Sequence, residues 1–353
     1  MPINRQAAFY EDEDEGIEYS PHTDGVEEVI DTDVESPFSL RIPISPRIPR
    51  GFSFEAQARA ASNLITFIDT EPEMITNETK LKQVFNTHSP DVGFVVGLEF
   101  EYEAPDRITE LEIQSLCEMT NMFNSTRDGS LRGKYSGELV SVPLSVSMFD
   151  SIKPTIASIE DYLSASHSSR TSTHIHVNVG EMSFTQFKYF LFLSLVCDLP
   201  MCDIYAPDRK HNNFSRCSSI DVNITDTLTS KNWLGMGNQL RERVISKYLT
   251  INLSNIKRRG YGTLEFRCFH GVDSANDLSN WHGSLKILHD KAMEEAQEGL
   301  KYTRGRFRFV RALADNSALY EFYCTVFGTD KVDILDMSQY QEVVDRLIYN
   351  YLG

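Results

Sequence analysis

The sequence has no C-x-x-C pair of the kind that zinc clusters use, and no cysteine-dense segment that would indicate a disulfide framework. The six cysteines of the 353-residue chain are scattered, at Cys117, Cys197, Cys202, Cys217, Cys268 and Cys324. Scattered free thiols are typical of proteins in a reducing compartment. We therefore expect a cytoplasmic protein with neither disulfide bonds nor a cysteine-bound zinc ion.

An apolar run long enough to cross a membrane is also missing, as is a basic, apolar leader at the N-terminus. We expect neither membrane insertion nor secretion. The chain has no basic run, and its 51 acidic and 34 basic residues give a formal net charge of −17. Charge therefore gives no support for nucleic-acid binding.

Most of the acidic excess is local. Residues 11–35 contain twelve acidic residues and no Lys or Arg, which leaves −5 of the −17 for the rest of the chain. We predict that residues 1–35 form a disordered, solvated tail; docking on a basic partner, or covering of a cationic active site, is the alternative. Four prolines within residues 36–51 predict an extended arm or linker over residues 36–53. A single folded domain is expected over residues 54–353.

Several helices can be placed from capping signals and apolar periodicity. Thr109 with Glu112 has the spacing of a capping box and predicts a helix over residues 109–123, with Leu111 among its core positions. Another helix is predicted over residues 151–164.

A strongly apolar helix is predicted to begin after Ser183, which forms a capping box with Gln186, and to be buried on most of its circumference. The chain from residue 278 onward is predicted to be mostly helical. There is no internal repeat and no regular alternation of strands and helices of the barrel or doubly wound kind. The fold class predicted is α+β, a mostly antiparallel sheet with helices packed on one face.

The strongest strand signal covers residues 94–103, FVVGLEFEYE, and has three carboxylates on one face. Alternate side chains of a strand share a face, so Glu99, Glu101 and Glu103 line up about 6.5–7 Å apart. Such a row of like charges destabilises a sheet unless a counter-charge lies above it. A hard divalent cation with oxygen ligands, Mg²⁺ or Mn²⁺, is the simplest counter-charge. The alternative is an amphipathic strand with its glutamates in water.

The same one-sided pattern recurs in later strands. The polar faces of these segments present His174, His176 and Asn178, then Asn252, and then Glu265 and Arg267. Another strand-like segment, residues 137–147, is interrupted by Pro143. If the polar faces converge, they form a pocket of carboxylates and imidazoles that binds a metal, and the donor-rich loop at residues 206–217 supplies phosphate contacts.

Five segments resemble, in order, the motifs of the phage and bacterial amidoligases. They are GLEFE, DGSL followed by GELVSVPLS, THIHVN, the loop that ends in SRC, and GTLEFRCFHG. The family belongs to the glutamine synthetase-like carboxylate-amine ligases, and the resemblance covers about residues 95–290. It implies an antiparallel sheet whose concave face holds ATP and divalent metals. It also places the protein in the host cytoplasm if a phage encodes it.

The resemblance implies a set of metal ligands. Glu99 and Glu101 match the ExE pair of the family, and Glu138 matches the acidic residue before its Ser-x-Pro segment. His174 matches the histidine placed near metal and phosphate. Glu265 matches the acid of the late ExR pair, which holds metal.

The resemblance also implies cofactor contacts, from His174, His176, Arg209, Arg216, Asn252 and Arg267. Arg267 is the guanidinium of the ExR pair and would contact phosphate. The chain departs from the family motifs at two places, and both departures bear on how the substrate would be positioned. It has Ser172 and Thr173 where the family commonly has Gly or Cys-Gly, and Asn178 where the family often has Asp.

The reaction implied is ATP-dependent condensation of a carboxylate with an amine. The carboxylate is phosphorylated first, and the acyl phosphate then reacts with the amine. The oxyanion needs a cationic neighbour, Arg267 or a metal, and the amine must lose a proton to a carboxylate base. Asp128 and Glu103 are both candidates for that base. The catalytic set is therefore expected to comprise Glu99, Glu101, Glu265, Arg267 and Asp128.

We predict an ATP- and Mg²⁺-dependent ligase that acts on a small-molecule or peptide carboxylate and an amine. A homo-oligomer is compatible with the resemblance, because glutamine synthetase builds sites between subunits. One alternative is an inactive structural or partner-binding protein of the same fold. Another is a metallohydrolase with His174 and His176 on zinc, which the excess of carboxylates over histidines disfavours.

Overall fold

In the computed structural model, the residues described are 75–87, 93–127, 131–166, 168, 170–209, 215–242, 245–246, 248–256, 260–271, 274–301 and 307–352. The predicted tail at residues 1–35 and the predicted arm at residues 36–53 lie outside the described residues. So do Asp128 and residues 210–214 of the donor-rich loop.

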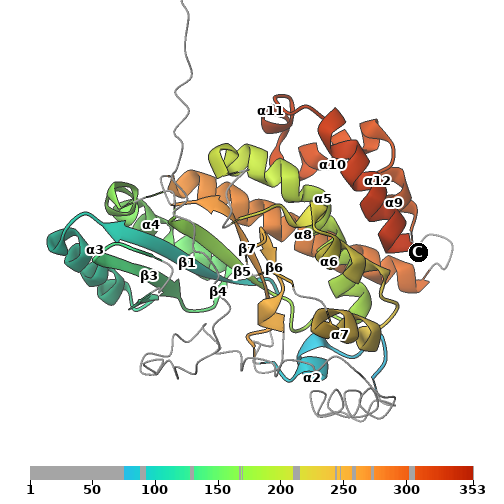
Figure 1. Ribbon diagram of the computed structural model, residues 1–353, viewed down its shortest axis with the longest axis horizontal. Helices are drawn as coiled ribbons and strands as arrows, with labels where there is room; N and C mark the ends of the chain where they lie inside the picture. Colours follow the sequence, from blue (N-terminus) through green and yellow to red (C-terminus); the bar gives the residue numbers. More distant parts are fainter. Residues whose placement is uncertain are drawn as a thin grey trace, which may run out of the picture. The chain divides into compact units, whose positions relative to one another are not determined.

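One sheet organises the described residues (Figure 1). Its strands are β1 (Val95–Ala104), β2 (Phe123–Thr126), β3 (Tyr135–Ser141), β4 (Leu144–Ser145), β5 (Ser172–Asn178), β6 (Ile251–Asn252) and β7 (Thr263–His270). Their order across the sheet is β2-β3-β1-β5-β7-β6, and β4 pairs with β1. Every ladder between these strands is antiparallel, so the predicted combination of helices with a mostly antiparallel sheet is confirmed.

Helices form the rest of the regular structure. They are α2 (Leu81–Phe85), α3 (Arg107–Thr120), α4 (Val146–Ala165), α5 (Phe184–Tyr205), α6 (Val222–Thr225), α7 (Trp233–Glu242), α8 (Ala275–Lys301), α9 (Arg308–Ala312), α10 (Asn316–Phe327), α11 (Thr329–Val332) and α12 (Ser338–Leu352). In Figure 1, α4 and α8 pass behind the strands. α5 packs against both α8 and β7, and α12 packs against α5. No helix among the described residues is long and apolar enough to cross a membrane.

The core lies between the sheet and these helices. Leu98, Phe100 and Tyr102 of β1 are each at most 1% exposed and belong to it. α5 begins with the predicted capping box of Ser183 and Gln186 and is buried along most of its length. The apolar face of β1 and the apolar α5 thus determine which side of the sheet is covered.

Two predicted helices have different starts. Asp106, not Thr109, caps α3, because its carboxylate accepts hydrogen bonds from Thr109 N at 2.8 Å and from Thr109 Oγ1 at 3.0 Å. Leu111 is 46% exposed, so its assignment to the core was wrong. The helix predicted from residue 151 begins five residues earlier, at Val146.

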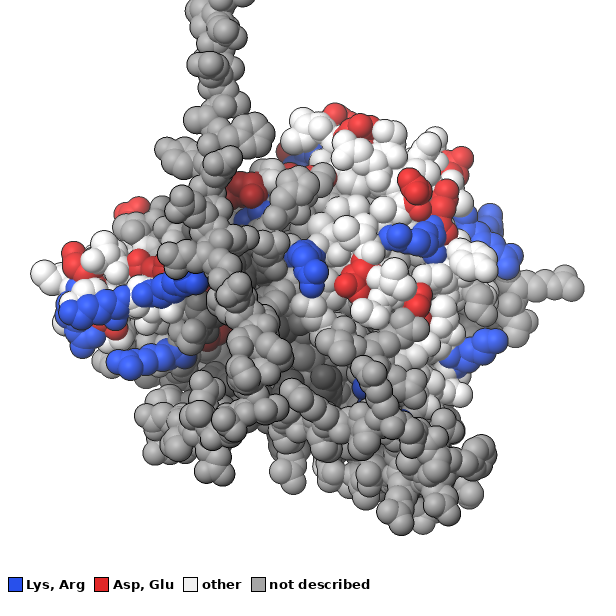
Figure 2. Space-filling model, in the orientation of Figure 1, with Lys and Arg blue, Asp and Glu red and all other residues white. Residues whose placement is uncertain are grey.

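The strand break at Pro143 is confirmed, because β3 ends at Ser141 and β4 begins at Leu144. The predicted strand around Asn252 is reduced to the two residues of β6. Figure 2 shows side chains of both charge signs near α3 and β3, and also among the helices on the opposite side of the view.

Candidate functional site

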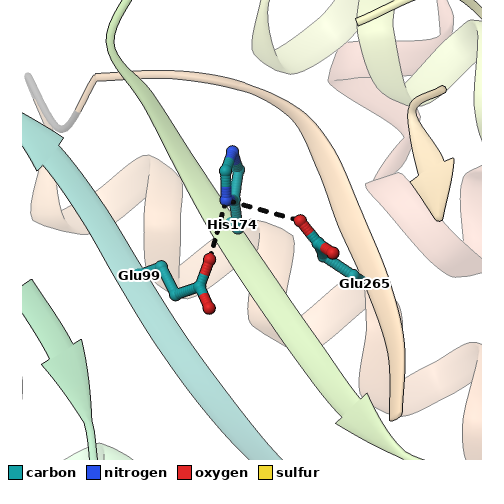
Figure 3. Close-up of side chains that lie close together, drawn as sticks. All are labelled: Glu99, His174 and Glu265. Carbon is teal, nitrogen blue, oxygen red and sulfur yellow. Dashed lines mark hydrogen bonds and ion pairs between the residues drawn. The ribbon is translucent and has the colours of Figure 1, made fainter. Parts of the chain in front are cut away.

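The polar residues of β1, β5 and β7 meet because these strands are neighbours in the sheet. The register pairs Glu99 with His174 across β1 and β5, and His176 with Glu265 across β5 and β7. Residues directly opposite one another on antiparallel strands share a face. In Figure 3 the side chains of Glu99, His174 and Glu265 point toward one another from the three strands. We call this side of the sheet, opposite the helices, the polar face.

Glu99, His174 and Glu265 form a compact, buried group. His174 Nδ1 lies 2.9 Å from Glu99 Oε2 and 3.5 Å from Glu265 Oε1. All three residues are buried, and each offers a ligand atom within 4.8 Å of the other two. Two carboxylates and one imidazole at this spacing can hold a metal ion.

His176 lies on the other side of Glu99. Its Nε2 is 2.9 Å from Glu99 Oε1, and its Nδ1 is 3.2 Å from Thr263 Oγ1. Burial acts to raise the pKa of Glu99, but the charge of His176 and the close side-chain contacts with His174 and His176 hold it well below its ordinary value. Burial acts to lower the pKa of His176, but Glu99 and Glu265 raise it overall. Glu99 is therefore an ionised carboxylate between two imidazoles.

Glu265 is held by three donors. Asn252 Nδ2 donates to Glu265 Oε2 at 2.7 Å, Asn255 Nδ2 donates to the same oxygen at 3.2 Å, and Arg267 donates to Oε1. Burial acts to raise the pKa of Glu265, but the charges of Arg267, His176 and His174 lower it overall. The two amides fix the carboxylate so that Oε1 faces His174.

Glu101 is close to this group without being part of it. The hydroxyl of Ser172 donates to Glu101 Oε2 and lies 2.7 Å from His174 Nε2, while Glu101 Oε1 is 3.9 Å from the same nitrogen. Glu138 of β3 is the register partner of Glu101 and is half-buried. Of the five predicted metal ligands, the structure thus gathers three in one group and places the other two beside it.

Arg209, which is buried, and Arg267, which is half-buried, border the carboxylates. Burial acts to lower the pKa of Arg267, but the charges of Glu265 and Glu101 raise it overall. Arg209 is 5% exposed and donates to the main-chain oxygen of Thr171; burial lowers its pKa, although Glu101 acts to raise it. The Nε atoms of both arginines are buried without a hydrogen-bond partner among the described residues.

Arg216 is placed differently from the other predicted contacts. Its side chain is exposed. Its main chain forms a parallel bridge with Leu249, at the edge of the sheet beyond β6.

The pairing of β5 with β7 contains an irregularity at the site. Thr173 faces Phe269 and Ile175 faces Phe266, so β7 has one residue more than β5 between these two pairs. Arg267 lies in this bulge, and Phe269 beyond it returns to the core, where its ring stacks on Trp281 at 4.9 Å. Bulges re-aim side chains in this way next to binding sites.

Glu103, one of the two candidate bases, anchors a turn. Its Oε1 accepts hydrogen bonds from Arg132 N at 2.8 Å and Gly133 N at 3.3 Å. Burial acts to raise the pKa of Glu103, but hydrogen bonds from Ser168, Arg132 and Gly133 hold it below its ordinary value. A carboxylate with a lowered pKa is a weaker proton acceptor. The geometry therefore favours a structural role for Glu103.

Asn255, Thr263 and the hydroxyl of Ser172 were not predicted as site contacts. Asn255 lies in the short 3₁₀ helix η5 (Ser254–Ile256), which breaks the period-2 pattern on which the strand predictions depend. Ser172 was noted as a departure from the family motif, but the sequence shows nothing of its hydrogen bonds.

The donor chemistry of the group fits a hard divalent cation, because carboxylates outnumber imidazoles. A zinc hydrolase with two histidine ligands fits less well, because His176 bonds Glu99 and Thr263 while the compact group contains one histidine. No protein-family model matches the chain, and no curated protein matches it either. A function for the polar face is therefore inferred from its side chains.

Proposed function

We propose that the protein is an ATP-dependent carboxylate-amine ligase of glutamine synthetase-like fold, with its active site on the polar face. The convergence of Glu99, His174 and Glu265 on one face of an antiparallel sheet carries this proposal. These residues come from three of the segments that resemble amidoligase motifs. Arg267, from the last of those segments, lies beside them.

Glu99, His174 and Glu265 would hold Mg²⁺ or Mn²⁺, with Glu101 and Glu138 beside them. Bound ATP would supply the phosphoryl group that activates the substrate carboxylate as an acyl phosphate, with ADP as the leaving group, and the metal would neutralise phosphate charge. The protein's own contribution is to fix the ligands before the metal arrives. Asn252 and Asn255 hold one oxygen of Glu265, which leaves the other aimed at His174.

The arginines supply positive charge to the same face. Arg267 bonds Glu265 through a terminal nitrogen, and its buried Nε is without a partner among the described residues. The Nε of Arg209 is also buried and without a hydrogen-bond partner among the described residues. Guanidinium donors suit phosphate oxygens and the oxyanion that forms when the amine attacks. Asp128 remains the proposed base, since the hydrogen bonds of Glu103 give that residue a structural role.

ADP release against a panel of amino acids and amines tests this function. Glu99→Ala and Glu265→Ala each remove one carboxylate of the compact group. We expect each to lower ATP turnover by at least about 100-fold, because oriented charge stabilisation of the transition state contributes effects of that size.

Glu112→Ala is the matched control, because this glutamate is exposed on α3. Its turnover should equal that of the wild type. ATP turnover that survives both Glu99→Ala and Glu265→Ala would overturn the metal roles. Activity that is independent of ATP, lost with EDTA and rescued by Zn²⁺ would favour the hydrolase instead.

A further inference from the structure

The hydroxyl of Ser172 joins two residues that the proposed function treats separately. It donates a hydrogen bond to Glu101 Oε2 and lies 2.7 Å from His174 Nε2. Ser172 is 3% exposed, so water competes little for these contacts. These contacts therefore define the direction of the O–H bond of Ser172.

That direction follows from the number of hydrogens available. A serine hydroxyl has one hydrogen to donate, and an ionised carboxylate can only accept. The hydrogen of Ser172 goes to Glu101, so Oγ has only a lone pair to offer His174. A hydrogen bond between Oγ and Nε2 then requires the hydrogen to be on Nε2.

The tautomer with hydrogen on Nε2 has a lone pair on Nδ1. Nδ1 is the atom that faces Glu99 Oε2 at 2.9 Å and Glu265 Oε1 at 3.5 Å. Three electron-pair donors then face one another, which is the arrangement that a bound cation needs. The opposite tautomer would direct an N–H at the carboxylates and leave no nitrogen lone pair for a metal.

We propose that Ser172 is a positioning residue that selects the tautomer of His174 and so makes Nδ1 the metal-binding atom of the Glu99, His174 and Glu265 group. The inference rests on the metal site of the proposed function. Metal-bound histidines generally donate their second ring N–H to a neighbouring acceptor, which fixes the tautomer. Here that acceptor is a hydroxyl whose own hydrogen is held by Glu101.

The same contacts give Glu99 and Glu101 of β1 different roles. Glu99 faces the metal-binding group directly, whereas Glu101 orients the hydroxyl that orients His174. Ser172 and Thr173 stand where the amidoligase motifs commonly have Gly or Cys-Gly before the HxH pair.

Titration with Mn²⁺ alone, followed by the EPR signal of the free ion, tests the role of Ser172. We expect Ser172→Ala to weaken Mn²⁺ binding about 10- to 100-fold, the usual loss when the partner of a metal-bound histidine is removed. Thr173→Ala is the matched control. Its hydroxyl is buried without a hydrogen-bond partner among the described residues, so Mn²⁺ affinity should not change.

Ser172→Thr keeps the hydroxyl and should bind Mn²⁺ nearly as well as the wild type. It also decides the matter if thermal melts show that Ser172→Ala fails to fold. The role of Ser172 is overturned if Ser172→Ala binds like the wild type, if folded Ser172→Thr loses as much affinity as Ser172→Ala, or if Thr173→Ala loses as much. Wild-type protein that binds no Mn²⁺ would overturn the metal site itself, and this inference with it.

Discussion

At the scale of single residues, His282 of α8 shows how burial changes the pKa of an acid–base group. It is 5% exposed, and its ring stacks on Phe149 with centroids 3.7 Å apart. Its Nε2 is buried without a hydrogen-bond partner among the described residues. Burial lowers the pKa of His282 to about 4, with a further lowering from Lys153. The imidazole is therefore neutral in the folded protein at neutral pH.

This neutrality predicts a pH dependence of stability. The unfolded chain binds a proton at His282 near pH 6.5, whereas the folded chain binds it only near pH 4. Because the unfolded state holds more protons within this window, the free energy of unfolding falls as the pH falls through it, by about 3 kcal/mol from this residue. Above pH 7 the contribution is absent.

We expect His282→Phe to keep the stacking and to flatten the decline in unfolding free energy between neutral pH and about pH 4.5. Urea unfolding at several pH values measures this pH dependence of the unfolding free energy. A variant whose stability declines as steeply as that of the wild type would contradict the assignment.

Single residues of the polar face were predictable to the extent that strand alternation determines them. Glu99, His174 and Glu265 were predicted from period-2 patterns, and the structure brings them within contact of one another. The orientation of each group was not predictable. It depends on Asn255 and Ser172, which contact Glu265 and His174 through folding and not through sequence spacing.

At the scale of elements, two glycines differ in the space around them, one in strand β3 and one in helix α8. A Cβ on Gly137 of β3 would lie 2.6 Å from Tyr102 Oη and 2.9 Å from the main-chain oxygen of Thr126. A Cβ on Gly283 of α8 would meet nothing within 4 Å.

The same substitution should therefore have opposite effects in the two elements. Gly137→Ala should lower the free energy of unfolding by about 1–3 kcal/mol, because it overpacks the contact of β3 with β1 and β2. Gly283→Ala should raise it by about 0.5–1 kcal/mol, because alanine favours helix. Urea denaturation measures both, and a neutral Gly137→Ala would show that β3 can move away from Tyr102.

Elements with strong local signals were predicted closely, and elements determined by tertiary contacts were not. β1 differs from the predicted residues 94–103 by one position at each end. β6 is short because the chain around it also pairs elsewhere: Thr250 N bonds Arg216 O, and Thr250 Oγ1 bonds Asp198 of α5. Neither contact leaves a mark on the period-2 pattern of that segment.

At the scale of the whole molecule, ligand binding should appear as added stability. A ligand that binds only the folded state at 100 times its Kd raises the free energy of unfolding by about 2.7 kcal/mol. We expect ATP with Mg²⁺ to raise the Tm of the wild-type protein by several degrees, and Glu265→Gln to reduce that shift. Thermal denaturation with ATP, with Mg²⁺ and with both measures it. No shift in the wild type would favour the non-catalytic alternative.

The order of strands was the part of the architecture that the sequence did not predict. β5 lies between β1 and β7, which places Glu99 and Glu265 on either side of His174 although they are far apart in the chain. The presence of an antiparallel sheet followed from the strand patterns, but the neighbours of each strand depend on which apolar faces α5 and α8 cover.

The bulge in β7 determines where the chain can change length. Deleting Cys268 would leave a strand of regular alternation in which Glu265 and Arg267 keep their side and Phe269 still reaches Trp281. Inserting one residue between Leu98 and Glu99 would instead turn every later side chain of β1 over and move Phe100 from the core to the polar face. Viable insertions and deletions should therefore concentrate at this one point in the three central strands, and a library of single-codon length variants would map it.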